Sequence, residues 1–138
     1  ALGAGDVPVA AGVSGPSLGC NGKFEFDCRY LASEDELDPS GGHELIFTAL
    51  ANASKDGRQV CIVLNSAVSD MLHVLQDARW KNLRHAVNNI TVMGGATVKA
   101  GALVADPLAS NNFIDLDAAT AVYARLSQEV PFFVVSRH

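Results

Sequence analysis

The chain has 138 residues and a formal net charge of −5, with 49% hydrophobic and 18% charged residues. This length suits one domain with its own core, and this composition excludes extensive disorder. A net negative charge with scattered basic residues argues against nucleic acid or an anionic membrane as partner, and no apolar run approaches the roughly 20 residues of a bilayer span. We expect a soluble protein, cytoplasmic or organellar, that forms one domain over residues 1–138.

The first third of the chain predicts a short strand and then a long irregular connection. Residues 7–11 (VPVAA) are apolar and end at Gly12, which is typical of a strand that runs into a turn. Residues 12–42 are rich in Gly, Ser, Pro and acids and have no sustained period, which indicates a functional or mobile loop. Cys20 and Cys28 flank a short part of it, where a disulfide is geometrically feasible in an oxidising compartment.

Residues 40–93 predict helices that alternate with strands. Ser40 precedes one helix, and Asn65 and Ser66 are suited to cap the next. The run 60–64 (VCIVL) between them is continuously apolar, as in a parallel strand covered on both faces, and Cys61 is expected there as a buried free thiol. A further helical piece over 80–87 leads into a strand over 90–93. The two apolar helix stripes are Leu45, Ile46, Ala49, Leu50 and Ala53, then Val68, Met71, Leu72 and Leu75.

The last third predicts a ligand-sized loop, a helix and a final strand. The paired glycines Gly94 and Gly95 predict a turn that needs a permissive backbone, and a long loop then runs to residue 112. Asp115 and Asp117 suit the start of a helix because acids favour the positive end of its dipole. The stripe of this helix is Ala118, Ala119, Val122, Tyr123 and Leu126, and Pro131 introduces the apolar run 132–135.

This order of elements predicts an α/β fold, three-layered, with a mostly parallel sheet and helices on both faces. The carboxyl ends of parallel strands meet at one edge of the sheet, where ligands bind. We therefore expect the segments that follow the strands to be neighbours. These are Gly12 and Gly15, Asn65 and Ser66, residues 94–112, and Ser136.

The stretch from the paired glycines to the last helix resembles the middle portion of the nucleoside hydrolase family, of the inosine-uridine-preferring type. A nucleoside-hydrolase-like branch reads PD…ANN..D…A…Y before a P..VV.R strand. The corresponding residues here are Asp106-Pro107, Ala109-Ser110-Asn111-Asn112, Asp115, Ala119, Tyr123 and 131–137. The resemblance implies an incomplete nucleoside hydrolase-like fold with a nucleoside or another ribosyl small molecule as ligand.

The same resemblance implies roles for particular residues. Asn112 or its neighbour Asn111 matches the asparagine that contacts the ribose hydroxyls, beside Gly94 and Gly95. An amide suits that task because it offers donors and an acceptor to vicinal hydroxyls. Residues 64–71 resemble the family's TGPLTNLA turn, so the Asn65 backbone carbonyl corresponds to a ligand of the Ca²⁺ ion that activates the attacking water.

Three elements of the family's site have no counterpart in residues 1–138. These are the amino-terminal Asp-rich strand (DxDxxxDD), the carboxyl-terminal His-Asp pair, and the ribose-contacting glutamate, where Ser110 stands. Calcium prefers several carboxylate oxygens, so we do not expect Ca²⁺ in this chain alone, and no catalytic residue is assigned.

Two functions are open. A nucleoside hydrolase-like protein would hydrolyse N-ribosidic bonds of nucleosides by a metal-activated water if completed by the missing segments, and would be inactive as the isolated chain. Alternatively, a catalytically inactive, truncated relative would serve as a binding or structural subunit, with a protein partner or as a homo-oligomer, because an incomplete sheet exposes apolar surface and edges. A third reading is an unrelated doubly wound domain that binds a small molecule at the strand ends.

Other polar residues have simpler explanations. Adjacent residues such as His43 and Glu44 point in different directions on a helix, so capping explains them better than acid-base catalysis. His73 and His85 lie on predicted helices as structural residues. A cation at Asp115 and Asp117 is the alternative to their role at a helix start.

Overall fold

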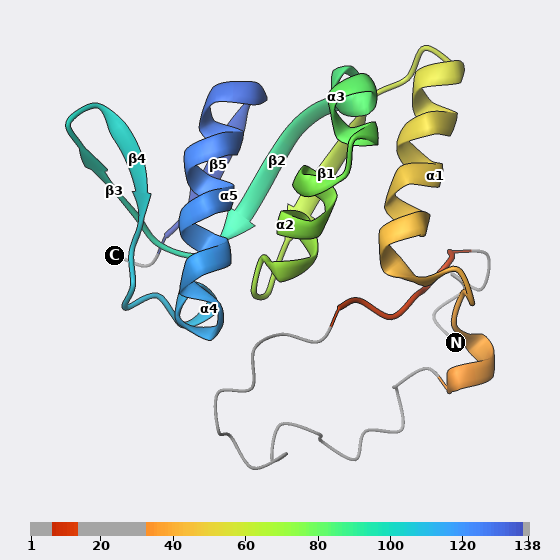
Figure 1. Ribbon diagram of the computed structural model, residues 1–138, viewed down its shortest axis with the longest axis horizontal. Coiled ribbons are helices and arrows are strands. Elements are labelled where there is room, and N and C mark those ends of the chain that lie inside the picture. Colours follow the sequence, from red (N-terminus) through yellow and green to blue (C-terminus); the bar gives the residue numbers. More distant parts are fainter. Residues whose placement is uncertain (1–6, 14–32, 137–138) are drawn as a thin grey trace.

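The computed structural model of the protein describes residues 7–13 and 33–136. Figure 1 shows the helices side by side over a twisted sheet, with a separate hairpin at one end. None of the helices in this part of the chain has the length and apolar character to cross a lipid bilayer. In chain order the elements are η1 (Glu34–Glu36), α1 (Gly41–Lys55), β1 (Val60–Leu64), α2 (Ser69–Gln76), α3 (Arg79–Leu83), η2 (Arg84–Ala86), β2 (Val87–Met93), β3 (Ala96–Lys99), β4 (Ala102–Ala105), α4 (Ser110–Ile114), α5 (Leu116–Glu129) and β5 (Phe132–Val135).

The main sheet has the order β1-β2-β5 with both pairings parallel. Ile90 in the central strand is paired with Ile62 on one side and with Phe132 on the other. Helical connections join these strands, as a parallel sheet requires. The predicted α/β class and mostly parallel sheet are confirmed.

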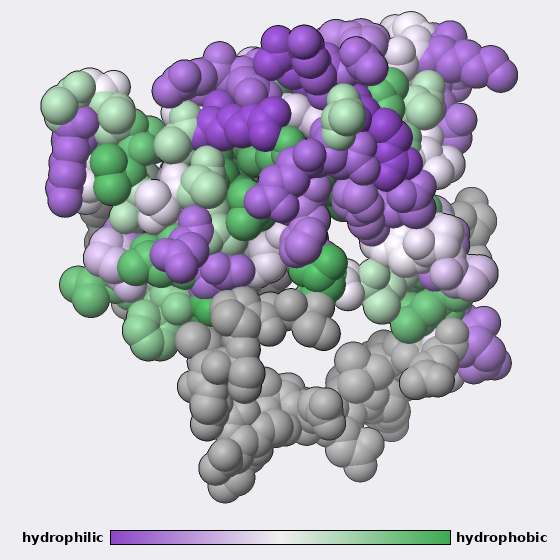
Figure 2. All heavy atoms as spheres, viewed as in Figure 1, coloured by the Kyte–Doolittle hydropathy of each residue, from purple (hydrophilic) through white to green (hydrophobic). Residues whose placement is uncertain are grey.

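The core lies between this sheet and a layer formed by α1, α2, α3 and α5. Ile90 and Val92 point into it from β2, and α5 contributes a fully buried stripe that ends at Leu126. Each buried aliphatic or aromatic side chain of this size contributes about 1.5–3 kcal/mol. Figure 2 shows hydrophilic side chains gathered over α3 and the neighbouring ends of α1 and α5, on the outer side of the layer.

The opposite face of the sheet is open in the described part of the chain. Val63 is 66% exposed, Phe133 57%, Val135 56% and Met93 50%. Of the two helical layers that the sequence predicts, the described residues form one. Cys61 shares this face and is an exposed free thiol, so the expectation of a buried one was wrong.

Residues 7–11 do not form the strand that their composition predicts. Their carbonyl groups accept instead from the start of α1 and from the residues before it: Asp38 N donates to Val9 O at 2.6 Å and Gly42 N to Ala11 O at 2.7 Å. Pro8 has no N–H group to give to a sheet, which favours this arrangement. In the connection over 12–42, the structure describes residues 12–13, η1 and the approach to α1, while Cys20 and Cys28 lie outside the described residues.

The loop predicted after Gly95 contains an antiparallel hairpin, β3–β4. Its two-residue turn places Ala100 at φ 50° and Gly101 at φ 80°. Two positive φ values are the signature of a type I′ turn, which matches the twist of a hairpin. The sequence did not reveal this turn because Ala100 occupies a position where Asn or Asp is usual.

The residues before the helices agree with expectation at α1 and α5 and differ at α2. Ser40 precedes α1 without a side-chain capping bond, and Val68, not Asn65 or Ser66, stands before α2. Asp115 caps α5 by accepting from Ala118 N at 3.0 Å. The interpretation of Asp115 as a helix-start residue is therefore confirmed.

Candidate functional site

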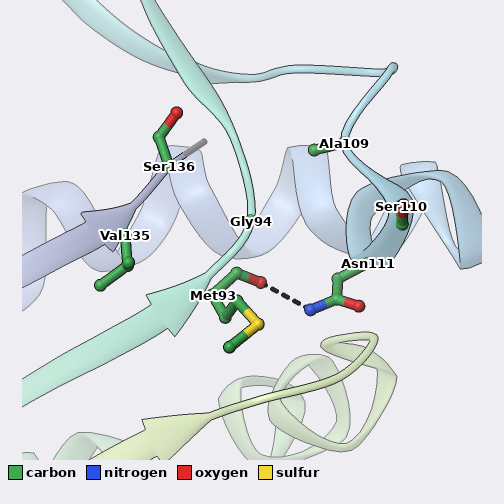
Figure 3. Close-up of a pocket in the computed structure, with 7 residues that line it drawn as sticks. All are labelled: Met93, Gly94, Ala109, Ser110, Asn111, Val135 and Ser136. Atoms are coloured by element: carbon green, nitrogen blue, oxygen red, sulfur yellow. Dashed lines mark hydrogen bonds between the residues drawn. The ribbon is translucent and has the colours of Figure 1, made fainter. Parts of the chain in front are cut away.

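A pocket of about 380 Å³ lies where β2 and β5 end (Figure 3). Both strands present their carboxyl ends here, and α4 faces them, so the pocket occupies the edge that the sequence predicts. A volume of this size accommodates a small-molecule ligand. The lining residues are Met93, Gly94, Ala109, Ser110, Asn111, Val135 and Ser136.

Asn111 bridges the ends of two strands from α4. Its side-chain Nδ2 donates to the carbonyl oxygen of Met93 at 2.8 Å and to that of Asn65 at 3.3 Å. Figure 3 shows the amide turned toward Met93 across the pocket. Because both Nδ2 hydrogens have acceptors, Oδ1 is the remaining polar atom of this side chain, and no donor among the described residues bonds it.

Asn112, the next residue, has the opposite environment. It is 1% exposed, and its Nδ2 donates to Gly95 O at 2.8 Å and to Asp106 O at 2.9 Å. Its Oδ1 accepts from the Tyr123 hydroxyl group at 3.1 Å. The amide of Asn112 is therefore occupied inside the protein and does not line the pocket.

Gly94 and Gly95 are required for space and not for a left-handed backbone. Neither has a positive φ, contrary to the expected need for a permissive conformation. A Cβ atom at Gly94 would overlap the Tyr123 hydroxyl and lie 2.9 Å from Asn112 Oδ1. A Cβ atom at Gly95 would lie 2.9 Å from the Cβ of Ala109. The glycines let the end of β2 lie directly against the α4 and α5 side chains.

The other residues expected at this edge are brought together in part. The Asn65 carbonyl and Ser136 both reach the surroundings of Asn111. Gly12 lies against α2, where Val13 N donates to Asp70 Oδ1 at 2.6 Å. Gly15 is outside the described residues.

At the position where the resemblance implies a metal ion, the structure describes the carbonyl group of Asn65. No three His, Cys, Asp or Glu side chains converge within residues 7–13 and 33–136. The Asn65 carbonyl already accepts a hydrogen bond from Asn111. These groups alone do not provide the set of carboxylate oxygens that Ca²⁺ prefers.

His43 and Glu44 belong to an ion-pair network that links α1 to α3. Arg79 donates to both oxygens of Glu44, at 2.8 and 2.7 Å, and to Asp77 at 2.7 Å. These bonds lower the pKa of Asp77 from 3.8 to about 2, chiefly through Arg79. The Arg79 guanidinium also lies 4.1 Å from the centre of the Phe47 ring, a cation–π arrangement. The network packs at a helix junction away from the pocket.

Tyr123 and Asp106 both bond to the Asn112 side chain behind the pocket, and the sequence did not assign either residue to the site. Tyr123 was predicted as one member of the apolar stripe of α5, and it is fully buried there. The available signal was its hydroxyl group, since a buried tyrosine in an otherwise aliphatic stripe needs a hydrogen-bond partner.

Neither His73 nor His85 lines the pocket. His73 is exposed on α2, and the Nε2 atom of His85 lies 2.9 Å from Ser54 Oγ.

Neither a protein-family model nor a curated protein matches the chain. Solved structures resemble it, among them two effector proteins. The type III effector protein XopQ, complexed with adenosine diphosphate ribose, is 28% identical with a TM-score of 0.66, over 76% of this chain and 30% of that chain. The effector protein XOO4466 is 27% identical with a TM-score of 0.65, over 76% and 29%. The shared architecture is a nucleoside hydrolase-like α/β fold. This chain spans about 30% of the length of these two neighbours.

Proposed function

We propose that the pocket at the ends of β2 and β5 binds the ribosyl group of a small molecule, in a nucleoside hydrolase-like protein. The observation that carries this proposal is the fixed orientation of the Asn111 amide. Its Nδ2 is held by the carbonyls of Met93 and Asn65, so Oδ1 is the atom left for a ligand. A ligand must therefore donate hydrogen bonds here, as sugar hydroxyl groups do.

Two further features support a ribosyl ligand. Besides Asn111, the pocket is lined by Ser110 and Ser136, which carry hydroxyl groups, and by the apolar residues Met93 and Val135. Mixed lining of this kind suits a sugar, which has both polar edges and apolar C–H faces. The structurally similar XopQ is complexed with adenosine diphosphate ribose, a molecule that contains ribosyl groups.

Hydrolysis of an N-ribosidic bond is proposed only for a polypeptide that adds carboxylates to this pocket. A water molecule at the sugar C1′ carbon needs a base or a metal ion to activate it, and the residues that line the pocket supply neither. Aspartates placed near the Asn65 carbonyl would complete such a site and hold Ca²⁺. We expect no hydrolysis by the 138-residue chain alone.

Titration calorimetry with ADP-ribose and adenosine tests the binding proposal. We expect wild-type protein to bind at least one of them and Asn111→Ala to bind about tenfold or more weakly, as expected for a lost hydrogen bond and a loosened pocket wall. Asn82→Ala is the matched control, since Asn82 is exposed on α3. Equal affinity of Asn111→Ala and wild type would exclude Asn111 as a ligand contact.

A second candidate function is that of a non-catalytic subunit in a larger assembly, and the open sheet face favours it. Parallel sheets are normally covered on both faces, and Val63, Phe133, Val135 and Met93 leave one face apolar and exposed. Native mass measurement of the protein from its source tests this candidate. A mass equal to one chain at high concentration, without binding of hydrophobic dyes, would exclude it.

A further inference from the structure

Two consecutive asparagines lie on opposite sides of the end of β2. Asn111 bonds to the Met93 carbonyl on the pocket side, and Asn112 bonds to the Gly95 carbonyl on the buried side. Gly94 lies between these two carbonyls, and its N–H donates to Val135 O at 3.0 Å. The strand end is therefore held from three directions, two of which come from α4.

The helix α4 cannot hold this position by itself. It has five residues, which is too short for stability without tertiary contacts. Its buried anchor is Asn112, whose Nδ2 joins the Gly95 carbonyl to that of Asp106, where the loop before α4 turns. The Asp106 side chain tightens this loop by accepting from Leu108 N at 2.9 Å.

The orientation of the Asn112 amide depends in turn on Tyr123. The Tyr123 hydroxyl group donates to Asn112 Oδ1 from α5, whose buried stripe is part of the core. Without this donor, Oδ1 would be a buried acceptor with no partner, which costs more than the bond itself contributes. Rotation of the amide would relieve that cost but would break the bonds to Gly95 and Asp106.

We propose that Asn112 and Tyr123 form a positioning pair that sets the Asn111 acceptor in the pocket. This inference rests on the proposed ribosyl binding at Asn111. The pair does not touch the ligand; it fixes α4 against the end of β2, and thereby the direction of Asn111 Oδ1. A purely structural tyrosine would contribute to folding but leave the affinity of the folded protein unchanged.

Tyr123→Phe is the variant that separates these two roles, because it keeps the ring and removes only the hydroxyl. We expect its dissociation constant for ADP-ribose or adenosine to rise by up to about tenfold, the loss expected when the Asn111 acceptor is no longer in place for the ligand. Val74→Ala serves as the control, since it opens the core at α2 and removes no hydrogen bond of the pair. It is expected to lower the melting temperature and leave the dissociation constant unchanged.

A measurement without ligand separates failure of this inference from failure of the proposed function. In NMR spectra of the free protein, the Nδ2 hydrogens of Asn111 should exchange faster in Tyr123→Phe than in wild type or Val74→Ala. Wild-type protein that binds neither compound would overturn the ribosyl site, while this exchange measurement would still test the pair. Unchanged amide exchange, or unchanged affinity in Tyr123→Phe, would overturn the positioning role.

Discussion

The hydroxyl group of Ser69 donates a 2.6 Å hydrogen bond to Asp115 Oδ2, which joins the start of α2 to the start of α5. The other carboxylate oxygen of Asp115 accepts from Ala118 N and caps α5. One side chain thus caps α5 at its start and joins it to the start of α2.

Replacement of Asp115 tests this double role. Asp115→Ala should lower the free energy of unfolding by about 1–3 kcal/mol, because the cap is lost and the part-buried Ser69 hydroxyl loses its acceptor. Asp115→Asn keeps a capping oxygen, so its free energy of unfolding should fall by clearly less. Urea denaturation measures both values, and equal losses would show that the charge, not the hydrogen-bond geometry, is what matters.

The overlap between Gly94 and Tyr123 predicts a suppressor relationship. Gly94→Ala should destabilise the protein in the wild-type background, because the new methyl group meets the Tyr123 hydroxyl. In the Tyr123→Phe background the same change should cost less, with a coupling of about 1 kcal/mol in a double-mutant cycle.

Gly57→Ala is the control for that cycle. Gly57 has φ 65° and nothing within 4 Å of an added Cβ atom, so its replacement introduces backbone strain without a clash. Its cost should be the same in both backgrounds. If the costs of Gly94→Ala and Tyr123→Phe are additive as well, the strand end moves away from α5 without a loss of stability.

The β3–β4 turn offers a stabilising substitution. Ala100 has φ 50°, a left-handed conformation that is unfavourable for alanine and tolerated by asparagine. Ala100→Asn would create an Asn-Gly turn and should raise the free energy of unfolding by about 0.5–1 kcal/mol. Ala100→Val should lower it. Thermal unfolding compares the three proteins, and a neutral or negative effect of asparagine would contradict the turn geometry.

Acid should remove the contribution that the Asp77 carboxylate makes to the stability of the folded state. Arg79 lowers the pKa of this carboxyl from 3.8 to about 2, so the carboxylate stabilises the folded state above pH 3.8. That stabilisation is lost as the pH falls from 3.8 toward 2. The difference in urea midpoint between wild type and Asp77→Asn should therefore shrink over this interval. A difference that stays constant from pH 5 to pH 2 would exclude the Arg79 interaction as its source.

The parallel strands could be predicted because runs such as Val60–Leu64 and Phe132–Val135 are apolar throughout. For the same reason, the sequence did not predict that one face of the sheet is exposed. A run that is apolar on both sides does not reveal which side meets a helix within this chain, so Val63 and Cys61 were expected to be buried.

The two asparagines show why the sequence predicts the edge of the sheet at which the pocket lies but not which of its residues line that pocket. Asn111 and Asn112 are chemically identical neighbours, and a resemblance to a motif cannot choose between them. The turn of α4 decides: about 100° of rotation per residue directs one amide to the pocket and the other to Tyr123. The sequence suggests that Gly94 and Gly95 provide backbone freedom. The structure shows that they provide space for side chains that come later in the chain.

Met93 and Val135 belong to two surfaces at once, the wall of the pocket and the open face of the sheet. A polypeptide that covers this face would therefore also become part of the surroundings of the proposed ribosyl ligand. Thermodynamic reciprocity then applies: if the covering polypeptide tightens ligand binding by some factor, the ligand tightens its attachment by the same factor. Ligand concentration and assembly would report on one another, even though the ligand and most of the interface never touch.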